Sequence, residues 1–354
     1  MLHPVNRPDC IDALWLAVYI QEELLELSLT KDPSDKANLL IIFSQETVHW
    51  LSSYKDDLLN GLNDYFQHPV VGDKKAILDA FRHDITYNAH LNDPGFVFQL
   101  QPKQNLPSGL SVAVGKWLEK FYDVITNVKK GFPAKVTGFS CDINGQVIYS
   151  ETLKKNPSLH VCPACDGTWM EKTSTGVLGS IDHFLPRSSY PALSVHPVNL
   201  LPICSTCNEK IKKNKDPLSE IHSRTLPETF HSYIRPARDI VQVQIGSSWV
   251  IVDNGMCTQN QLFLFPDIFD LPGRWQQDAD EFDRVVRRRI RDSIDAKKDG
   301  IQNVDQKAFD RILLRLDQRL CDEWGGVGNS FPATWYFRWL CQNKKAELIH
   351  DYVG

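Results

Sequence analysis

Two short stretches, Cys162-Pro163-Ala164-Cys165 and Cys204-Ser205-Thr206-Cys207, decide the fold of this chain. Four thiolates arranged as two Cys-x-x-Cys pairs are the donors of a closed tetrahedral zinc site. The 38 residues 166–203 lie between the pairs. A simple zinc ribbon needs fewer, so this segment must hold structure of its own. We expect Cys162, Cys165, Cys204 and Cys207 to bind a structural Zn²⁺; the alternative is four free thiols.

The segment between the pairs carries a second group of polar residues. It reads Ile181-Asp182-His183-Phe184-Leu185-Pro186 and then Asn199-Leu200-Leu201-Pro202, and Asn208 follows the last cysteine. Residues 175–184 and 199–203 are expected to form strands, and residues 207–215 a helix. The order is therefore strand, long loop, strand, helix. An Asp-His pair with two asparagines is typical of a hydrolytic metal site.

These residues resemble the HNH endonucleases of the ββα-metal fold, over about a sixth of the chain. The resemblance implies that His183 is the general base and that Asp182 binds a divalent metal. It implies that Asn199 holds the loop and orients the histidine. It also implies that Asn208 is the second protein ligand, as in an HNN variant. Oxygen ligands suit Mg²⁺ or Mn²⁺.

Each of these residues also has an ordinary structural interpretation. His183 could be a core histidine, and Asp182 could belong to a turn or a helix cap. Asn199 could be a turn residue, and Asn208 could cap the helix after the second cysteine pair. The combination with both cysteine pairs favours the nuclease interpretation.

The charge distribution limits how nucleic acid could bind. The net charge is −5, so phosphate contacts must come from local patches rather than from the whole molecule. Candidate contacts are Arg187 and the lysines Lys212, Lys213 and Lys215; the alternative is a solvated helix face. A second basic cluster, 284–291, is interleaved with acidic residues, which favours a salt-bridged surface helix over a nucleic-acid groove.

The regions on either side of the cysteine module are expected to be mainly helical. Residues 1–133 form the first region, 134–225 the module, and 226–354 the last region. Helices are expected at 9–27, 34–66, 73–85, 112–130, 276–297, 304–324 and 333–343. Hairpins are expected at 134–139 with 146–150, around Asp142-Ile143-Asn144-Gly145, and at 240–245 with 248–253.

The whole pattern predicts a mostly helical α+β protein with a small ββα-metal module and a structural zinc. No apolar run approaches the ~20 residues that span a bilayer, so a cytoplasmic protein without membrane contact is expected. The expected function is cleavage of phosphodiester bonds, in DNA, as in stand-alone anti-phage defence nucleases. The flanking helices could bind a partner protein or a second copy. Alternatives are a non-catalytic zinc module and an RNA-directed toxin nuclease.

Overall fold

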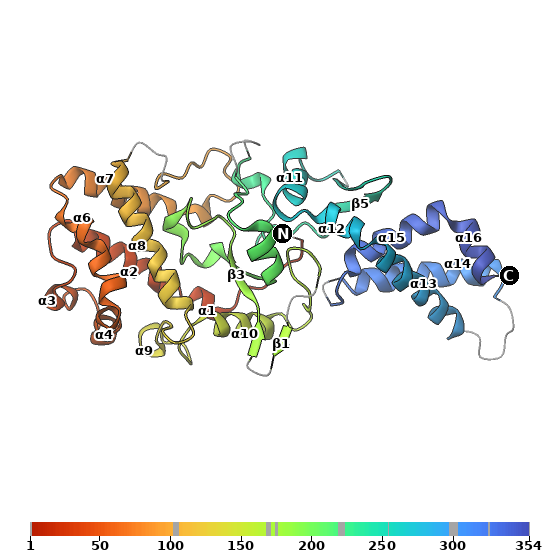
Figure 1. The fold of residues 1–354 in the computed structure, drawn as a ribbon, viewed down its shortest axis with the longest axis horizontal. Helices are drawn as coiled ribbons and strands as arrows, with labels where there is room; N and C mark the ends of the chain where they lie inside the picture. The colour runs from red at the N-terminus through yellow and green to blue at the C-terminus, as the bar shows by residue number, and fades with distance from the viewer. Residues whose placement is uncertain are drawn as a thin grey trace.

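The computed structural model describes residues 2–101, 106–167, 171–173, 176–218, 224–253, 255–296, 304–324 and 326–353. The chain has a mostly helical α+β fold, as predicted, and the described strands form two-stranded sheets. Figure 1 shows an elongated molecule. The first helices lie at one end, strand β3 (Ser180–His183) lies near the centre, and the last helices lie at the other end. No described helix is long and apolar enough to cross a membrane.

The N-terminal part of the fold, residues 2–155, is a set of helices packed mainly around one hydrophobic cluster, and it includes α9 and α10, which the sequence analysis assigned to the module. Its helices are α1 (Asp9–Asp12), α2 (Trp15–Leu27), α3 (Lys36–Leu39), α4 (Gln45–Ser53), α5 (Lys55–Leu58), η1 (Asn60–Leu62), α6 (Asn63–Gln67), α7 (Val71–Asp84), η2 (Tyr87–Ala89), α8 (Ser108–Thr126), α9 (Ala134–Thr137) and α10 (Gly145–Lys155).

Two predictions for this region are wrong. The single helix expected over 34–66 is broken into short helices. The side chains of Asp35 and Ser44 cap α3 and α4, so that a new helix begins after each of them. The hairpin expected around 134–150 does not form. Asn144 instead accepts hydrogen bonds from the backbone of Gln146 and Val147 and so caps α10.

The remaining elements build the module and the C-terminal region. They are β1 (Glu171–Thr173), β2 (Gly176–Leu178), β3, η3 (Pro191–Leu193), η4 (Pro197–Asn199), β4 (Leu200–Ile203), η5 (Thr206–Lys212), η7 (Leu226–Glu228), β5 (Val241–Ile245), β6 (Trp249–Asp253), α11 (Gln259–Leu264), η8 (Phe265–Phe269), α12 (Leu271–Gln277), α13 (Ala279–Asp295), α14 (Gln306–Asp322), α15 (Ser330–Asn343) and α16 (Lys345–Tyr352). The hairpin predicted at 240–253 is confirmed as β5–β6. Helix α16 was not predicted.

The antiparallel pair β3–β4 lies between the two hydrophobic clusters of the molecule. Ile181 and Leu200 belong to the N-terminal cluster, whereas Leu201 and Ile203 belong to the cluster that continues into the C-terminal region. Successive side chains of a strand point to opposite faces, so β4 is buried on both sides. The strand predicted over 175–184 is shorter than expected, and Thr175 lies outside the described residues.

The start of β3 is fixed by close packing on α10. A Cβ at Gly179 would lie 1.7 Å from the ring carbon Cζ of Tyr149. Only glycine allows the strand and the aromatic ring to approach this closely. The packing therefore sets where β3 begins and how its last residues project.

Buried histidines connect the module to its neighbours. His196 Nε2 donates to the carbonyl of Ile85 (3.1 Å), and His231 Nε2 donates to the carbonyl of Val198 (2.8 Å). Both side chains are essentially inaccessible to solvent. Burial lowers the pKa of each to about 3, so both are neutral in the folded protein at neutral pH.

These histidines predict a loss of stability in acid. A pKa lowered in the folded state means that the unfolded chain binds more protons, so stability is complete above the ordinary value of 6.5 and falls as the pH drops toward 3. Between about pH 7 and about pH 5, the free energy of unfolding measured with urea should fall by about 2 kcal/mol for each histidine. The side chain in His231→Gln stays neutral and keeps a donor and an acceptor, so the loss of stability between these pH values should be smaller by the contribution of one histidine. A loss as large as that of the wild type would contradict this.

Candidate functional site

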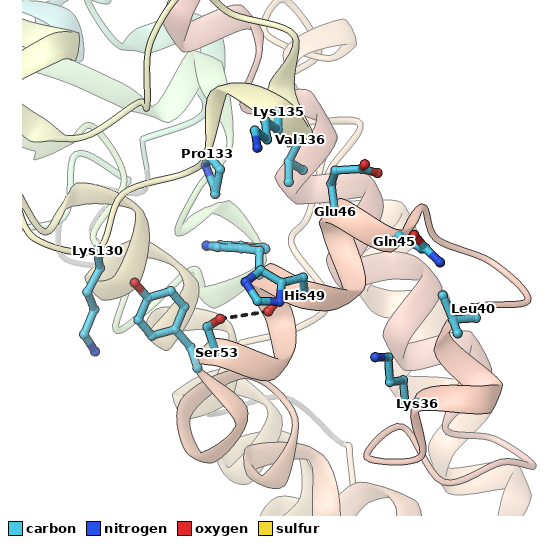
Figure 2. A pocket seen from close by; sticks show the side chains of 12 residues that line it. Lys36, Leu40, Gln45, Glu46, His49, Ser53, Lys130, Pro133, Lys135 and Val136 are labelled. Carbon is cyan, nitrogen blue, oxygen red and sulfur yellow. Dashed lines mark hydrogen bonds between the residues drawn. The ribbon is translucent and has the colours of Figure 1, made fainter.

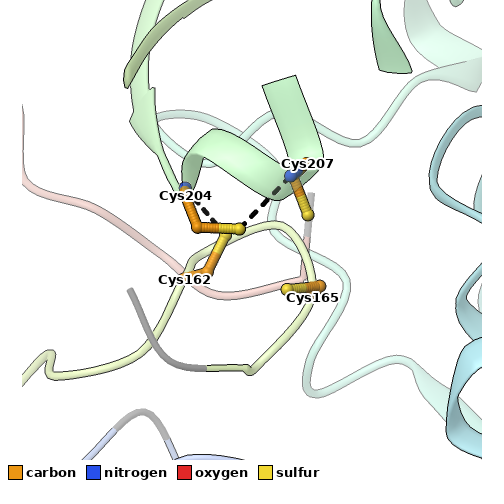
Figure 3. A group of neighbouring side chains, drawn as sticks. All are labelled: Cys162, Cys165, Cys204 and Cys207. Atoms are coloured by element: carbon orange, nitrogen blue, oxygen red, sulfur yellow. Dashed lines mark hydrogen bonds between the residues drawn. The ribbon is translucent and has the colours of Figure 1, made fainter. Parts of the chain in front are cut away.

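The cysteine pairs meet in one buried cluster. The sulfur atoms of Cys162, Cys165, Cys204 and Cys207 all lie within 4.8 Å of one another (Figure 3). The backbone N–H of Cys204 donates to Cys162 Sγ (3.4 Å), and that of Cys207 donates to Cys204 Sγ (3.3 Å). Such N–H···S contacts stabilise thiolates around a metal. We call these residues the four-cysteine cluster; it can hold a metal ion.

The first cysteine pair forms a tight turn. The N–H of Asp166 donates to the carbonyl of Cys162 (2.9 Å), and Asp166 has a φ of 63°. Asp tolerates this left-handed conformation better than most residues. A Cβ on the following Gly167 would lie 3.3 Å from Cys165 Sγ, so a side chain there would crowd the sulfur.

The N-terminal residues and helix α15 both contact this turn. The N–H groups of Leu2 and His3 donate to the carbonyl of Pro163 (2.7 and 2.9 Å). The side chain of Asp166, fully buried, pairs with His3 Nε2 (2.5 Å) and accepts from the N–H of Phe331 in α15 (2.8 Å). The N-terminus accordingly lies near the middle of the molecule in Figure 1.

Helix α12 supplies the cationic neighbour of the cluster. Arg274 Nη1 donates to Cys207 Sγ (3.4 Å), and Trp275 Nε1 donates to the carbonyl of Cys165 (3.4 Å). Burial lowers the pKa of Arg274, but the nearby sulfur atoms of Cys165 and Cys207 outweigh it and raise the pKa. Burial raises the pKa of Cys162. Several buried thiolates can therefore coexist only with a cation among them.

Metal binding by the cluster is tested by removing one donor. Because metal binding and folding are coupled at such sites, Cys204→Ser should lose most of the metal found by elemental analysis and become sensitive to limited proteolysis. Cys141→Ser is the matched control, since Cys141 is exposed and outside the cluster. Metal retained by Cys204→Ser at the level of Cys141→Ser would contradict the assignment.

The second group of predicted residues gathers beside this cluster. Asp182 and His183 end strand β3, and Asn208 lies on the adjoining η5, directly after Cys207. The three side chains line a cavity of about 200 Å³, which is also lined by Tyr122 and Arg187. We call Asp182, His183 and Asn208 the candidate hydrolytic site.

The imidazole of His183 is held in one tautomer. Its Nε2 lies 2.8 Å from the carbonyl oxygen of Ser194, which can only accept, so Nε2 carries the proton. No hydrogen bond to Nδ1 occurs among the described residues. Burial lowers the pKa of His183 to about 3. The ring is therefore neutral, with a free lone pair on Nδ1.

Asp182 is almost fully buried, and one of its two carboxylate oxygens accepts a hydrogen bond. Its Oδ1 accepts from Lys212 Nζ (2.9 Å), whereas its buried Oδ2 has no hydrogen-bond partner among the described residues. Burial raises the pKa of Asp182, and the neighbouring ammonium opposes this shift. Asn208 Nδ2 donates to Ser180 Oγ and to the carbonyl of Ile181, which leaves its amide oxygen free within the described part of the chain.

Asn199 holds the loop between β3 and β4. Its Nδ2 donates to the carbonyls of Leu185 (3.0 Å) and Leu193 (3.1 Å), and its Oδ1 accepts from the N–H of Leu185 (2.8 Å). The side chain is fully buried. It thereby fixes the loop whose Ser194 carbonyl orients His183.

The predicted phosphate contacts differ in whether solvent can reach them. Lys212 is 1% exposed and is bound to Asp182 and to the His183 carbonyl, so its prediction as a surface contact is wrong. Lys213 and Lys215 are exposed, and Lys213 lines the cavity. Arg187 also lines it but pairs with Asp123 and Glu119.

Two residues of the site were missed by the sequence analysis. Tyr122 of α8 donates its hydroxyl to the carbonyl of Ile181 (3.1 Å), and its ring lies 4.3 Å from that of His183. Ser194 supplies the carbonyl that fixes His183 and donates its hydroxyl to the carbonyl of Leu118. Neither belongs to a local motif, because both act through tertiary packing of α8 on the module.

Other charged features lie apart from this site. A hollow of about 620 Å³ lies beside α4 and α9, and the exposed Lys36 and Lys135 are among the residues that line it. Figure 2 shows the lining side chains from close by. The arginines of α13 are largely paired. Arg287 contacts Asp283, Glu347 and Asp351, in line with the salt-bridged helix favoured from the sequence.

The chain is similar to protein ea31 of Escherichia phage lambda, with 30% identity over 117 residues. The match covers 33% of this chain and 33% of that protein, so the chain spans about a third of the length of this relative. No family model and no solved structure matches the chain.

Proposed function

We propose that the chain is a metal-dependent HNH-type endonuclease that hydrolyses phosphodiester bonds in DNA. The observation that carries the proposal is the buried Oδ2 of Asp182, which has no partner among the described residues and belongs to a residue that lines one cavity with His183 and Asn208. A buried carboxylate oxygen without a partner is costly and needs an explanation. A divalent cation would satisfy it.

The geometry of His183 fits a general base, whereas burial lowers its pKa to about 3, below the near-neutral value that is best for this role. With Nε2 bound to the Ser194 carbonyl, Nδ1 is the atom that can take a proton from a water molecule. Burial keeps the ring neutral before the reaction. Tyr122 and Asn199 support the ring and the loop that carries Ser194, so the base keeps a fixed direction.

Asp182 Oδ2 and the amide oxygen of Asn208 would hold Mg²⁺ or Mn²⁺, since hard cations prefer oxygen ligands. When bound, the ion neutralises the scissile phosphate and stabilises the leaving oxygen. The four-cysteine cluster would hold Zn²⁺, because four sulfur donors without an open position are typical of a structural zinc.

A second function has one observation in its favour. Lys212 already neutralises Asp182, so the pair could serve only to stabilise the fold of a non-catalytic zinc module that binds nucleic acid or protein. The free Nδ1 of His183 and the unpartnered Oδ2 of Asp182 have no role in such a module. They favour the nuclease.

The nuclease is tested with supercoiled plasmid, linear DNA and RNA, each with and without Mg²⁺ or Mn²⁺. Wild-type protein should nick or cut DNA only with the divalent ion and stop on addition of EDTA. His183→Ala should keep its zinc content and its DNA binding while cleavage falls roughly a hundredfold, the range for a lost general base.

The outcomes separate the candidate functions. Cleavage that persists after exhaustive treatment with EDTA would contradict a divalent-ion mechanism. Cleavage by His183→Ala at the wild-type rate would favour the non-catalytic module, with any wild-type activity due to a contaminant. Cleavage of RNA alone would assign the RNA-directed alternative.

Phosphate binding is expected from the exposed lysines beside the cavity. Lys213→Glu with Lys215→Glu should weaken DNA binding and lower the salt slope of the affinity by about 2. Lys36→Glu with Lys135→Glu, in the hollow of Figure 2, is the control with the same change of charge. A larger loss in the control pair would move the DNA-binding surface to the N-terminal helices.

A further inference from the structure

Lys212 bridges the two consecutive residues that carry the proposed chemistry. Its Nζ donates to Asp182 Oδ1 (2.9 Å) and to the carbonyl of His183 (2.6 Å), and the side chain is 1% exposed. A buried ammonium is tolerated only where hydrogen bonds and a counter-charge surround it. Both are present here, so the contact is built into the fold.

The geometry of η5 produces this contact. Its N–H···O bond from Lys213 to Asn208 (2.9 Å) spans five residues, which is the π-helical pattern. Lys213 has a φ of 52°, a strained conformation for a residue other than glycine. Asn208 thereby contacts Ser180 and Ile181, and Lys212 contacts the next two residues of β3.

The contact with Lys212 makes the two carboxylate oxygens of Asp182 different. Oδ1 is bound to Lys212, and Oδ2 is buried without a partner. The carboxylate can therefore offer only Oδ2 to a metal, in a direction that Lys212 sets. The ammonium also adds a positive charge next to the ligand, which opposes the approach of a second cation.

We propose that Lys212 is a positioning residue that presents Asp182 as a one-oxygen ligand and keeps the affinity for the divalent metal low. This inference rests on the proposed function. Second-sphere partners that fix a ligand usually alter metal affinity or activity by about 10- to 100-fold when they are replaced. A cationic partner differs from the usual carboxylate or carbonyl, because its removal should strengthen metal binding while the ligand loses its orientation.

The test is a Mn²⁺ titration of the full-length, zinc-loaded protein, followed by the electron paramagnetic resonance signal of free Mn²⁺. Lys212→Met should bind Mn²⁺ about tenfold more tightly and cleave plasmid about tenfold more slowly at saturating Mn²⁺. Lys212→Arg, which keeps the charge, should retain the wild-type affinity within about threefold. If Lys212→Met loses its zinc, the neutral Lys212→Gln carries the same expectation.

Each contrary result has its own meaning. Unchanged affinity and rate in the neutral variant would reduce Lys212 to a structural residue. Tighter binding with faster cleavage would make Lys212 a block on the metal site and overturn the positioning role. Asp182→Asn is the reference variant: if it binds Mn²⁺ as the wild type does, the proposed metal site fails, independently of Lys212.

Discussion

The four-cysteine cluster is the constraint on which the rest of the structure depends. It joins the two ends of segment 166–203, so that β3, β4 and η5 lie side by side. The turn of its first pair contacts the N-terminal residues at Pro163, α15 at Asp166, and α12 at the carbonyl of Cys165. All three regions of the chain therefore meet at one buried group of sulfur atoms, and loss of a bound metal there would loosen all of them together.

The position of the candidate hydrolytic site follows from this arrangement. Strand β3 lies between two hydrophobic clusters, and its last three residues, Ile181, Asp182 and His183, are among those that line the cavity. Because both sides of the β3–β4 pair are packed, Asp182 is buried and His183 half-buried, and both side chains are oriented without a ligand. The same burial lowers the pKa of His183 and leaves Asp182 Oδ2 without a partner.

The sequence predicted the residues with local patterns and missed those that depend on tertiary packing. The cysteine spacing predicted the cluster. Asp182, His183 and Asn208 line one cavity, whereas Asn199 lies outside it and holds the loop between the strands. The Asn-Gly pair at 144–145 suggested a turn, but the same asparagine side chain is equally suited to cap a helix.

Lys212 shows why charge alone is a weak guide to exposure. In the sequence it belongs to a run of lysines typical of a solvated helix face. The π-helical form of η5 directs this one side chain inward, where Asp182 and the His183 carbonyl surround it. No pattern of residue types announces a π-helix, and Tyr122, from a helix about sixty residues earlier, is equally invisible to local motifs.

The central claim is that one module holds two different metal ions, a structural ion among sulfur atoms and a hydrolytic ion among oxygen atoms. Anomalous diffraction from crystals soaked in Mn²⁺, recorded at the zinc and manganese absorption edges, tests it most directly. The account predicts a zinc peak within the four-cysteine cluster and a separate manganese peak beside Asp182 and Asn208. A zinc peak with no manganese at Asp182 would contradict it.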